Sequence, residues 1–520
     1  MTTCCVDNCD HDAYSGNSKC ILHCDKGDYA SDRHMVGFLK SFDDALIDRI
    51  VNSLFEYTDE IPNINKIVLT KYLNATDTKK TNTELINFAK ESTVVLAEIV
   101  FPQWDSRDNF NYTRYLNKLG SIHFNYCEFK SHDLTDQGIR IFFQNCQFHD
   151  DWHIVNALVL ENVNNVLYQD CIFYGNASAY TERNGIGHIN QIHSQLFNNC
   201  DFRKELSFNR INFSFPIFNN TDDVPTKIKE IKIVGCTIDS KFILNNCTID
   251  KFLSEDTVFK SKFEFKQNTV SNFEITNSNF FELVDTYKTK YRMFKMHKSI
   301  CEDFVGFENC EFGEANNNSK GLLPRFLYAT FTSFVNFRNT EFHSGLDIEH
   351  VNLKESPNFL NAKINPTNSN RETFRIIKNS FDEIGNHIEA NKFFVLEMKK
   401  YKEELAGTNQ YQERCILFLN EIISNFGQSY MRPIFMMIAA SFIYFGLVFG
   451  YEKEALYKIY IPANDCLSAI SALANNVSKN ILPFSRFLKN GMESVSLAFY
   501  IIFVSLAWQI VVAVKRHTRR

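Results

Sequence analysis

The sequence predicts a β-solenoid with flanking α-helices, followed by an α-helical membrane domain with two spans. Three observations lead to this prediction. Large apolar residues recur five places apart through the middle of the chain, and Phe is far above ordinary usage at 50 of 520 residues. Two long uncharged apolar runs stand near the C-terminus. A core layer that repeats many times, followed by segments that cross a bilayer, accounts for all three.

The five-residue spacing is clearest in FQNCQF, at 143–148, which has apolar first and sixth residues, Asn third and a small fourth residue. An apolar period of five suits neither a helix, which needs 3.6, nor an alternating strand, which needs 2. It suits a coil of four sides with about five residues each, stacked on the next coil. We find twelve such phrases, at 124–129, 143–148, 168–173, 197–202, 208–213, 233–238, 244–249, 265–270, 275–280, 307–312, 337–342 and 359–364.

The steps between phrases agree with a coil of about twenty residues. Phe129 to Phe148 is 19 residues and Phe342 to Ile364 is 22. Steps of 10 or 11 also occur, as if two sides of one coil carried the phrase. The longer interval 280–312 is expected to hold loops or a bulged coil.

These phrases resemble the pentapeptide-repeat family over roughly 116–365, although N-C-x-F replaces the family's usual A-D/N-L-x-x. The resemblance implies a right-handed, four-sided β-helix with a large apolar residue at the inward centre of each five. Periodicity alone supports only a coiled β-solenoid.

Seven of the 15 cysteines stand at the fourth position of a phrase. A metal or redox array needs accessible, converging thiolates, whereas stacked coils place these cysteines in a column inside an apolar wall. We therefore expect them to pack as small buried residues, and we expect the preceding Asn to cap turns or to form a hydrogen-bonded ladder. The seven are Cys127, Cys146, Cys171, Cys200, Cys236, Cys247 and Cys310.

The segment 1–30 holds a different group of cysteines. Cys4-x4-Cys9-x10-Cys20-x2-His23 offers three thiolates and one imidazole, a complete tetrahedral set for structural Zn²⁺ in a short segment. The stretch also resembles the small zinc ribbons of bacterial and phage proteins. Cys5 could replace Cys4, and Cys24 could replace His23. Four strong ligands leave no open position, so catalytic zinc is not expected.

Residues 31–115 are expected to form an N-terminal cap of helix and strand. The stretch 36–57 has the apolar spacing of an amphipathic helix, which would cover the unpaired β edge of the solenoid. The stretch 94–105 is expected to be the strand-rich start of the first coil.

After about residue 370 the five-residue period stops. The stretch 372–405, within the hairpin and linker segment 371–430, predicts two helices that break at Gly385 and Asn386. Its pattern resembles F-x-x-x-G-N-x-x-E-A-x-x-F in the hairpin that follows the repeats of bacterial membrane-associated pentapeptide-repeat proteins. The matching residues are Phe381, Gly385, Asn386, Glu389, Ala390 and Phe393.

The segment 431–514 is predicted to be the membrane domain, because each of the runs 434–451 and 495–514 can cross a bilayer core. The basic tail 515–520 favours a cytoplasmic C-terminus, and two spans bring the N-terminus to the same side. The connection 452–494 would then lie on the far side.

Two features of this domain leave alternatives open. Within the connection, 467–484 could lie in the interface or re-enter the membrane. Gln509, in the second run, either packs between helices of an oligomer or lines a pore, and packing is favoured.

The sequence predicts no enzyme, because no Gly-rich phosphate loop and no hydrolase or metalloprotease motif occurs. A net charge of -6 gives no general attraction to nucleic acid, and no specific nucleic acid is predicted. The start has no apolar stretch that could serve as a secretory signal, which favours a cytosolic, reduced solenoid.

The leading hypothesis is a solenoid anchored in the bacterial inner membrane. It would recognise a protein or other macromolecule in the cytosol, contact membrane lipid and form a homo-oligomer through its membrane helices. A sharper version makes it an antiphage effector that permeabilises the membrane. The alternatives are a constitutive ion-channel-like protein and a passive scaffold.

Overall fold

The computed structural model describes most of the 520-residue chain and divides it into two units, Met1–Asn368 and Ser369–Arg520. The described residues are 3–6, 9–14, 17–26, 36–55, 65–75, 83–102, 113–116, 118–130, 140–154, 166–180, 190–219, 225–315, 320–452, 470, 472–475 and 488–518.

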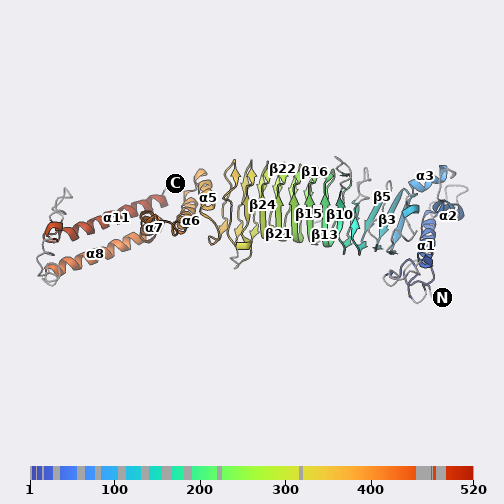
Figure 1. The fold of residues 1–520 in the computed structure, drawn as a ribbon, viewed down its shortest axis with the longest axis horizontal. Helices are drawn as coiled ribbons and strands as arrows, with labels where there is room; N and C mark the ends of the chain where they lie inside the picture. The colour runs from blue at the N-terminus through green and yellow to red at the C-terminus, as the bar shows by residue number, and fades with distance from the viewer. Residues whose placement is uncertain are drawn as a thin grey trace. The chain divides into compact units, whose positions relative to one another are not determined.

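The first unit contains the predicted β-solenoid, with its parallel strands stacked side by side (Figure 1). One five-stranded sheet contains β1 (Thr93–Ala97), β3 (Ser121–Asn125), β5 (Arg140–Gln144), β8 (Tyr168–Gln169) and β12 (Phe197–Asn198). A second contains β17 (Phe242–Ile243), β20 (Phe263–Glu264), β23 (Val284–Asp285), β26 (Val305–Gly306) and β30 (Val335–Asn336). An eight-stranded sheet contains β11 (Asn190–Ile192), β14 (Ile211–Phe213), β16 (Thr237–Ile238), β19 (Val258–Phe259), β22 (Asn279–Phe280), β25 (Ile300–Cys301), β29 (Thr330–Phe331) and β32 (Asn352–Leu353).

A 15-stranded sheet completes the coils. It contains β2 (Val100–Phe101), β4 (Glu128–Phe129), β6 (Gln147–Phe148), β7 (Trp152–His153), β9 (Ile172–Phe173), β10 (Ala177–Tyr180), β13 (Asp201–Asn209), β15 (Thr226–Val234), β18 (Cys247–Glu255), β21 (Thr269–Thr276), β24 (Lys290–His297), β27 (Glu311–Phe312), β28 (Arg325–Leu327), β31 (Glu341–Phe342) and β33 (Lys363–Ile364). A short 3-10 helix, Lys320–Leu322, follows β27. Since β1 pairs with β3, the parallel ladder already includes residues 93–97.

The most regular coils repeat every 21 residues. Ile228 pairs with Ile249, which pairs with Val270, which pairs with Tyr291. The predicted coil of about twenty residues is therefore confirmed. One coil runs along β15, turns into β16 and β17, and reaches β18, which lies directly over β15.

The phrase marks corners of the coil. In all twelve predicted phrases the third residue is left-handed, with φ between +48° and +62°. Asn is the residue that adopts this conformation most readily after Gly, because its short polar side chain can bond locally. Side-chain amides also stack from coil to coil: Asn361 donates to Asn339 Oδ1 at 3.2 Å, and Asn339 donates to Asn309 Oδ1 at 3.3 Å. Both roles expected of this Asn, turn and ladder, are present.

The expectation of loops or a bulged coil between 280 and 312 is wrong. Two further left-handed corners stand there, at Lys288 and Lys298, and β23, β24 and β25 continue the regular pairing. The phrase 286–291 begins with Thr286, whose buried hydroxyl donates to the carbonyl of Gly306 at 3.0 Å. A bonded hydroxyl thus replaces the apolar residue that the pattern requires.

The phrase cysteines are buried, as predicted, and they also bond to the corner. Cys146 Sγ lies 3.5 Å from the carbonyl oxygen of Phe124 on the preceding coil and 3.3 Å from that of Gln144. Thr289 makes the same cross-coil bond with its hydroxyl, to Phe265 at 2.7 Å. Burial raises the pKa of Cys236 to about 11 and that of Cys310 to about 12, so these thiols stay protonated at neutral pH.

The corner geometry gives a direct test at Asn145, where φ is +53°. Asn145→Val should lower stability by roughly 1–2 kcal/mol or more, because a β-branched side chain is strained in the left-handed region. Asn145→Gly should stay within about 1 kcal/mol of the natural chain, since Gly adopts positive φ freely. Hydrogen exchange of 140–154 would measure both changes. Equal costs for Val and Gly would contradict the corner assignment.

Helices cover the N-terminal end of the solenoid, as predicted. Phe42, in α1 (Val36–Phe55), is fully buried and packs edge-on against Phe101 at 6.0 Å between ring centroids. Residues 56 and 57 of the predicted helix lie outside the described residues. The other helices of this region are α2 (Lys66–Asn74), α3 (Thr83–Glu91) and α4 (Thr113–Leu116).

The second unit begins with the predicted helical hairpin, α5 (Arg371–Glu383) and α6 (His387–Leu405). The break is where the sequence placed it: Gly385 has φ +74°, and the Asn386 side chain accepts a bond from the Glu389 N–H at 3.3 Å. A further helix, α7 (Tyr411–Ser424), occupies the segment predicted as linker.

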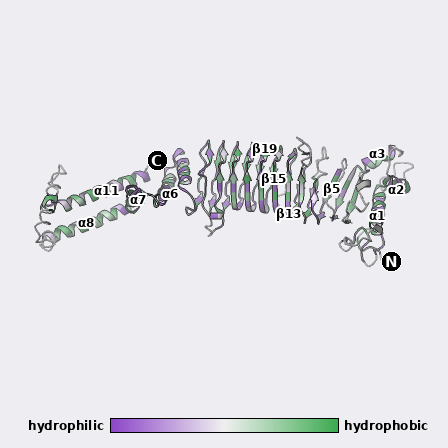
Figure 2. Cartoon of the chain, viewed as in Figure 1, coloured by the Kyte–Doolittle hydropathy of each residue, from purple (hydrophilic) through white to green (hydrophobic). Residues whose placement is uncertain are grey.

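Two helices, α8 (Met431–Glu452) and α11 (Glu493–Thr518), are long and apolar enough to cross a membrane. The most apolar part of α8 has none of its residues buried, and that of α11 has 17% of its residues buried. Hydrophobic residues run along both helices (Figure 2). Between them, Tyr444 donates a hydrogen bond to Ser496 at 3.0 Å. Of the segment 467–484, only residues 470 and 472–475 are described, so its expected interfacial or re-entrant path lies outside the described residues.

Gln509 uses both ends of its amide within the chain. The Ser424 hydroxyl donates to Gln509 Oε1 at 2.9 Å, and Gln509 Nε2 donates to Asn420 Oδ1 at 3.0 Å. The second apolar helix is thereby joined to α7. This arrangement agrees with a packing role, made inside one chain rather than between copies.

Candidate metal centre

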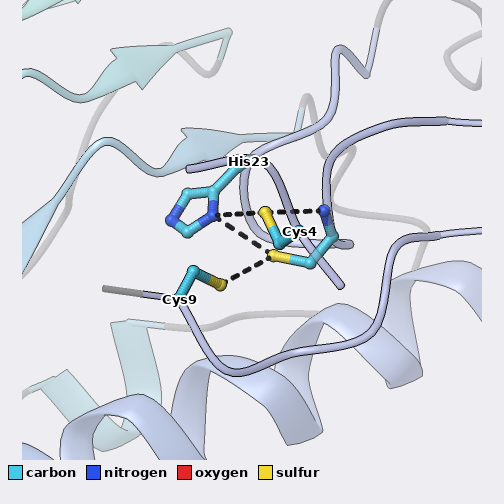
Figure 3. Close-up of side chains that lie close together, drawn as sticks. Cys4, Cys9 and His23 are labelled. Atoms are coloured by element: carbon cyan, nitrogen blue, oxygen red, sulfur yellow. Dashed lines mark hydrogen bonds between the residues drawn. The ribbon is translucent and has the colours of Figure 1, made fainter. Parts of the chain in front are cut away.

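The N-terminal segment folds into two short turns that face each other. Cys4 donates its backbone N–H to the carbonyl of His11 at 3.0 Å, and Thr3 pairs with Asp12 as an antiparallel bridge. A tight turn follows at 20–24, where the N–H groups of His23 and Cys24 donate to the Cys20 carbonyl. This pairing places Cys4, Cys9, Cys20 and His23 around one point (Figure 3).

The distances between the candidate ligand atoms are close to those between ligands of one metal ion. Cys9 Sγ lies 3.6 Å from Cys20 Sγ, and Cys20 Sγ lies 3.2 Å from His23 Nδ1. Cys4 Sγ is 3.6 Å from the same nitrogen, and all four ligand atoms lie within 4.8 Å of one another. Zinc bond lengths imply tetrahedral edges of about 3.5–3.8 Å. The group is therefore compact enough to hold one ion.

The electrostatics of the group also suit a cation. Burial lowers the pKa of His23 to about 4, so its imidazole is neutral at pH 7, the form that binds metals. Burial raises the pKa of Cys9 to about 12, so its thiolate requires a positive charge beside it. Burial also acts to raise the pKa of Cys4, but the pKa is lowered because backbone N–H groups, including that of Cys20 at 3.2 Å, bond its sulfur.

The two alternative ligands lie outside this group. Cys5 is exposed, and its Sγ lies 3.7 Å from the Ser18 hydroxyl. Cys24 is buried in a small apolar cluster with Phe38 and Leu39. Adjacent residues in an extended segment point opposite ways, so Cys4 faces the group and Cys5 faces solvent.

Leu22 and Lys26, next to the candidate ligands in sequence, connect the N-terminal segment to the solenoid. Leu22 accepts a hydrogen bond from the Val100 N–H at 2.9 Å, which extends the backbone pairing of the first coil. Lys26 is 2% exposed; its Nζ donates to the carbonyls of Leu22 at 2.9 Å and Cys24 at 2.7 Å and lies 5.3 Å from the Phe42 ring centroid. No sequence pattern singles out Lys26, because its role depends on this docking.

Three thiolates and one imidazole form a donor set that favours zinc over harder cations. A site with four protein ligands supplies folding energy and leaves no position open for a substrate. Among the described residues, this is the one group of three or more His, Cys, Asp or Glu side chains placed to hold a metal ion. Its docking on the first coil indicates a structural role for such an ion.

Comparison with protein-family models, curated proteins and solved structures finds no match for this chain. The fold, the candidate metal group and the two apolar helices are therefore the features that bear on function.

Proposed function

We propose that this protein is a non-enzymatic β-solenoid, anchored in a membrane, that recognises a macromolecular partner in the cytosol. One observation carries the proposal: a long parallel solenoid and two apolar helices whose side chains remain largely unburied belong to the same chain. Apolar helices of 22 and 26 residues are long enough to cross a bilayer core of about 30 Å. A four-ligand metal group supports a structural rather than a catalytic metal.

The proposed orientation places both termini in the cytosol of a bacterial cell, with α8 and α11 crossing the inner membrane. Lys515 and Arg516 follow the apolar run of α11 directly, and positive charge favours the cytoplasmic side.

An aromatic corner of the solenoid is our candidate for contact with a protein partner. Tyr328 is 56% exposed, stacks on His350 at 5.1 Å between centroids, and meets His297 edge-on at 6.2 Å. Exposed Tyr is enriched at protein interfaces because it offers a large rigid surface with one polar end. Many charged groups elsewhere on the solenoid pair between coils, such as Lys295 with Glu274 at 2.6 Å.

The sharper proposal adds oligomerisation through the membrane helices and, after partner binding, opening of the membrane as an antiphage response. The internal bonding of Gln509 favours anchoring over a pore lined by that residue. A constitutive channel-like protein and a passive scaffold are separated from the effector by experiment.

The test uses cells that express the full chain or a chain truncated after residue 430. The full chain should remain in membranes after alkaline carbonate extraction, and the truncated chain should be released. Recovery of the full chain as a soluble protein would contradict membrane anchoring. Membrane potential is then followed with and without phage infection to separate the three proposed functions. Loss of the potential only on infection supports the effector, and constant loss supports a channel. No loss under either condition supports a passive scaffold.

Partner recognition is tested by capture of cytosolic proteins on the purified full chain. Tyr328→Ala should weaken capture of a specific partner, whereas Tyr126→Ala, at another exposed solenoid corner with 59% exposure, should not. Equal loss in both variants, or in neither, would contradict recognition at the His297, Tyr328 and His350 corner.

A further inference from the structure

Helix α7 carries an exposed apolar stripe along one face. The residues recur at positions i, i+4, i+7, i+8 and i+11, which lie on the same side of an α-helix. Tyr411 is 71% exposed, Phe418 50%, Leu419 49% and Ile422 42%, and Cys415 in the middle is also exposed. The stripe, as we call these residues, is Tyr411, Cys415, Phe418, Leu419 and Ile422.

The opposite face of α7 is held by the rest of the unit. Leu417 and Ser424 are buried, and Ser424 and Asn420 bond to Gln509 of α11. Lys402 of α6 pairs with Glu421 at 2.5 Å. Packing on one side fixes the rotation of α7 about its axis, so the stripe faces away from the unit.

The bonds to Gln509 also fix the depth of α7. Gln509 lies five residues before Val514, the last residue of the apolar run in α11. At 1.5 Å per residue the distance along the helix is about 7–8 Å. Interfacial helices bury their apolar face about 5–10 Å into the boundary between headgroups and acyl chains. α7 is thus attached at the depth where such a helix lies.

Two more features agree with a position of α7 at the membrane interface. After α7 the chain turns through Asn425 and Gly427, both with positive φ, and enters α8 at Met431. Lys402 Nζ lies 5.3 Å from the Phe418 ring centroid, at the edge of the stripe. A Lys beside an apolar stripe suits an interface, where its stem contacts apolar groups and its ammonium reaches the headgroups.

We infer that α7 is an interfacial helix whose stripe inserts into the cytosolic face of the bilayer that α8 and α11 cross. This inference rests on the proposed membrane anchoring and identifies lipid as the occupant of the stripe. A second copy of the chain would be the competing occupant. Because α7 contacts α6, α8 and α11, lipid contact at the stripe sets the level at which the α5 and α6 hairpin meets the membrane.

Cys415 provides a probe at the centre of the stripe. Cys5→Ser removes a second exposed thiol, and Cys466→Ser removes a thiol that lies outside the described residues. The full chain with both substitutions carries an environment-sensitive fluorophore on Cys415 and is reconstituted into phosphatidylcholine and phosphatidylglycerol vesicles. The matched control carries the fluorophore one residue earlier, in Arg414→Cys with Cys415→Ser, because residue 414 is exposed but lies outside the stripe. Quenching is measured with lipids spin-labelled near the headgroup and with aqueous iodide.

We expect the fluorophore at 415 to be quenched several-fold more by the spin-labelled lipid, and several-fold less by iodide, than the fluorophore at 414. Equal iodide quenching at both positions would overturn the inference. Protection of 415 from both quenchers, together with Cys415 cross-linking between copies, would also overturn it in favour of a second copy. Carbonate extraction separates the two failures: a retained chain with an aqueous 415 rejects only the interfacial helix, whereas a released chain rejects membrane anchoring.

Discussion

Phe148→Ala is expected to destabilise its coil by about 3–5 kcal/mol, the usual cost of truncating a fully buried Phe. Phe148 has no exposed surface and touches aromatic rings above, below and beside it. It stacks on Phe129 at 5.2 Å and on Phe173 at 4.6 Å between centroids, and it packs against Trp152 at 4.4 Å. Removing the ring leaves a cavity in the middle of a continuous stack.

That cavity has little means of collapsing, which favours the upper part of the range. The neighbouring rings sit on strands whose backbones are paired in register, with Phe129 opposite Phe148 and Phe148 opposite Phe173. Strands of adjacent coils cannot move closer than their hydrogen-bonded spacing allows. The cost therefore includes lost contacts that relaxation does not restore.

Cys146→Ala, two residues away in the same phrase, is the matched control. It removes one buried sulfur and two weak contacts to carbonyls, and it should cost at most about 1 kcal/mol. Native-state hydrogen exchange of 140–154 in the detergent-solubilised full chain measures both, because repeat arrays open in local units. If the two substitutions cost the same, the aromatic ends of the phrase do not carry the architecture.

The spacing of the aromatic residues predicted the coil because it follows from the geometry of every turn. Each phrase needs a large residue on both sides of a left-handed corner, so the pattern survives wide variation at other positions. A hydroxyl residue in place of the first apolar residue is one cause of a missed phrase, although the corner at Tyr328 was missed with Phe326 and Phe331 at the ends of its phrase. Ser254 and Thr286 begin phrases that the pattern did not include, and both hydroxyls are bonded inside the core, Ser254 with Ser278 at 3.1 Å.

The candidate metal group shows a different limit of prediction from the sequence. The spacing in the sequence gives six candidate ligands. Only four of them are brought together, because the folded turns decide which side chains face inward. Cys24 packs against Phe38 and Leu39, which are distant enough in sequence that no local rule predicts the contact. The same holds for Lys26 and for the bond between Val100 and Leu22.

Helix α7 shows which part of a helix the sequence alone does not predict. It lies in the segment 371–430, for which the sequence predicts a helical hairpin and a linker, and its apolar residues recur at helical spacing. No side chain caps its N-terminus at Gln410, and its packed face depends on Gln509, 85 residues beyond Ser424. Long-range bonds of this kind are fixed only by the folded unit.

Loss of the candidate metal group is expected to have the largest effect of these changes, because it should unfold the N-terminal segment that contains the group. Cys20→Ser removes the central ligand, which is fully buried and lies within 3.6 Å of Cys9 and His23. Apparent zinc binding contributes about 10–16 kcal/mol to the folding of comparable short domains at pH 7, so residues 3–26 should not remain folded without it. The purified full chain should contain one zinc per chain, and Cys20→Ser close to none.

The consequence should extend to the first coil, because the Val100 N–H donates to Leu22 at 2.9 Å. Loss of the folded segment removes that acceptor, so the amide of Val100 should exchange with solvent faster in Cys20→Ser and in chelator-treated protein. Cys5→Ser is the control, since Cys5 is exposed and outside the group. It should retain both zinc and slow exchange. Stoichiometric zinc in Cys20→Ser would contradict the ligand set, and zinc loss without faster exchange at Val100 would mean that the metal folds its own segment without supporting the solenoid.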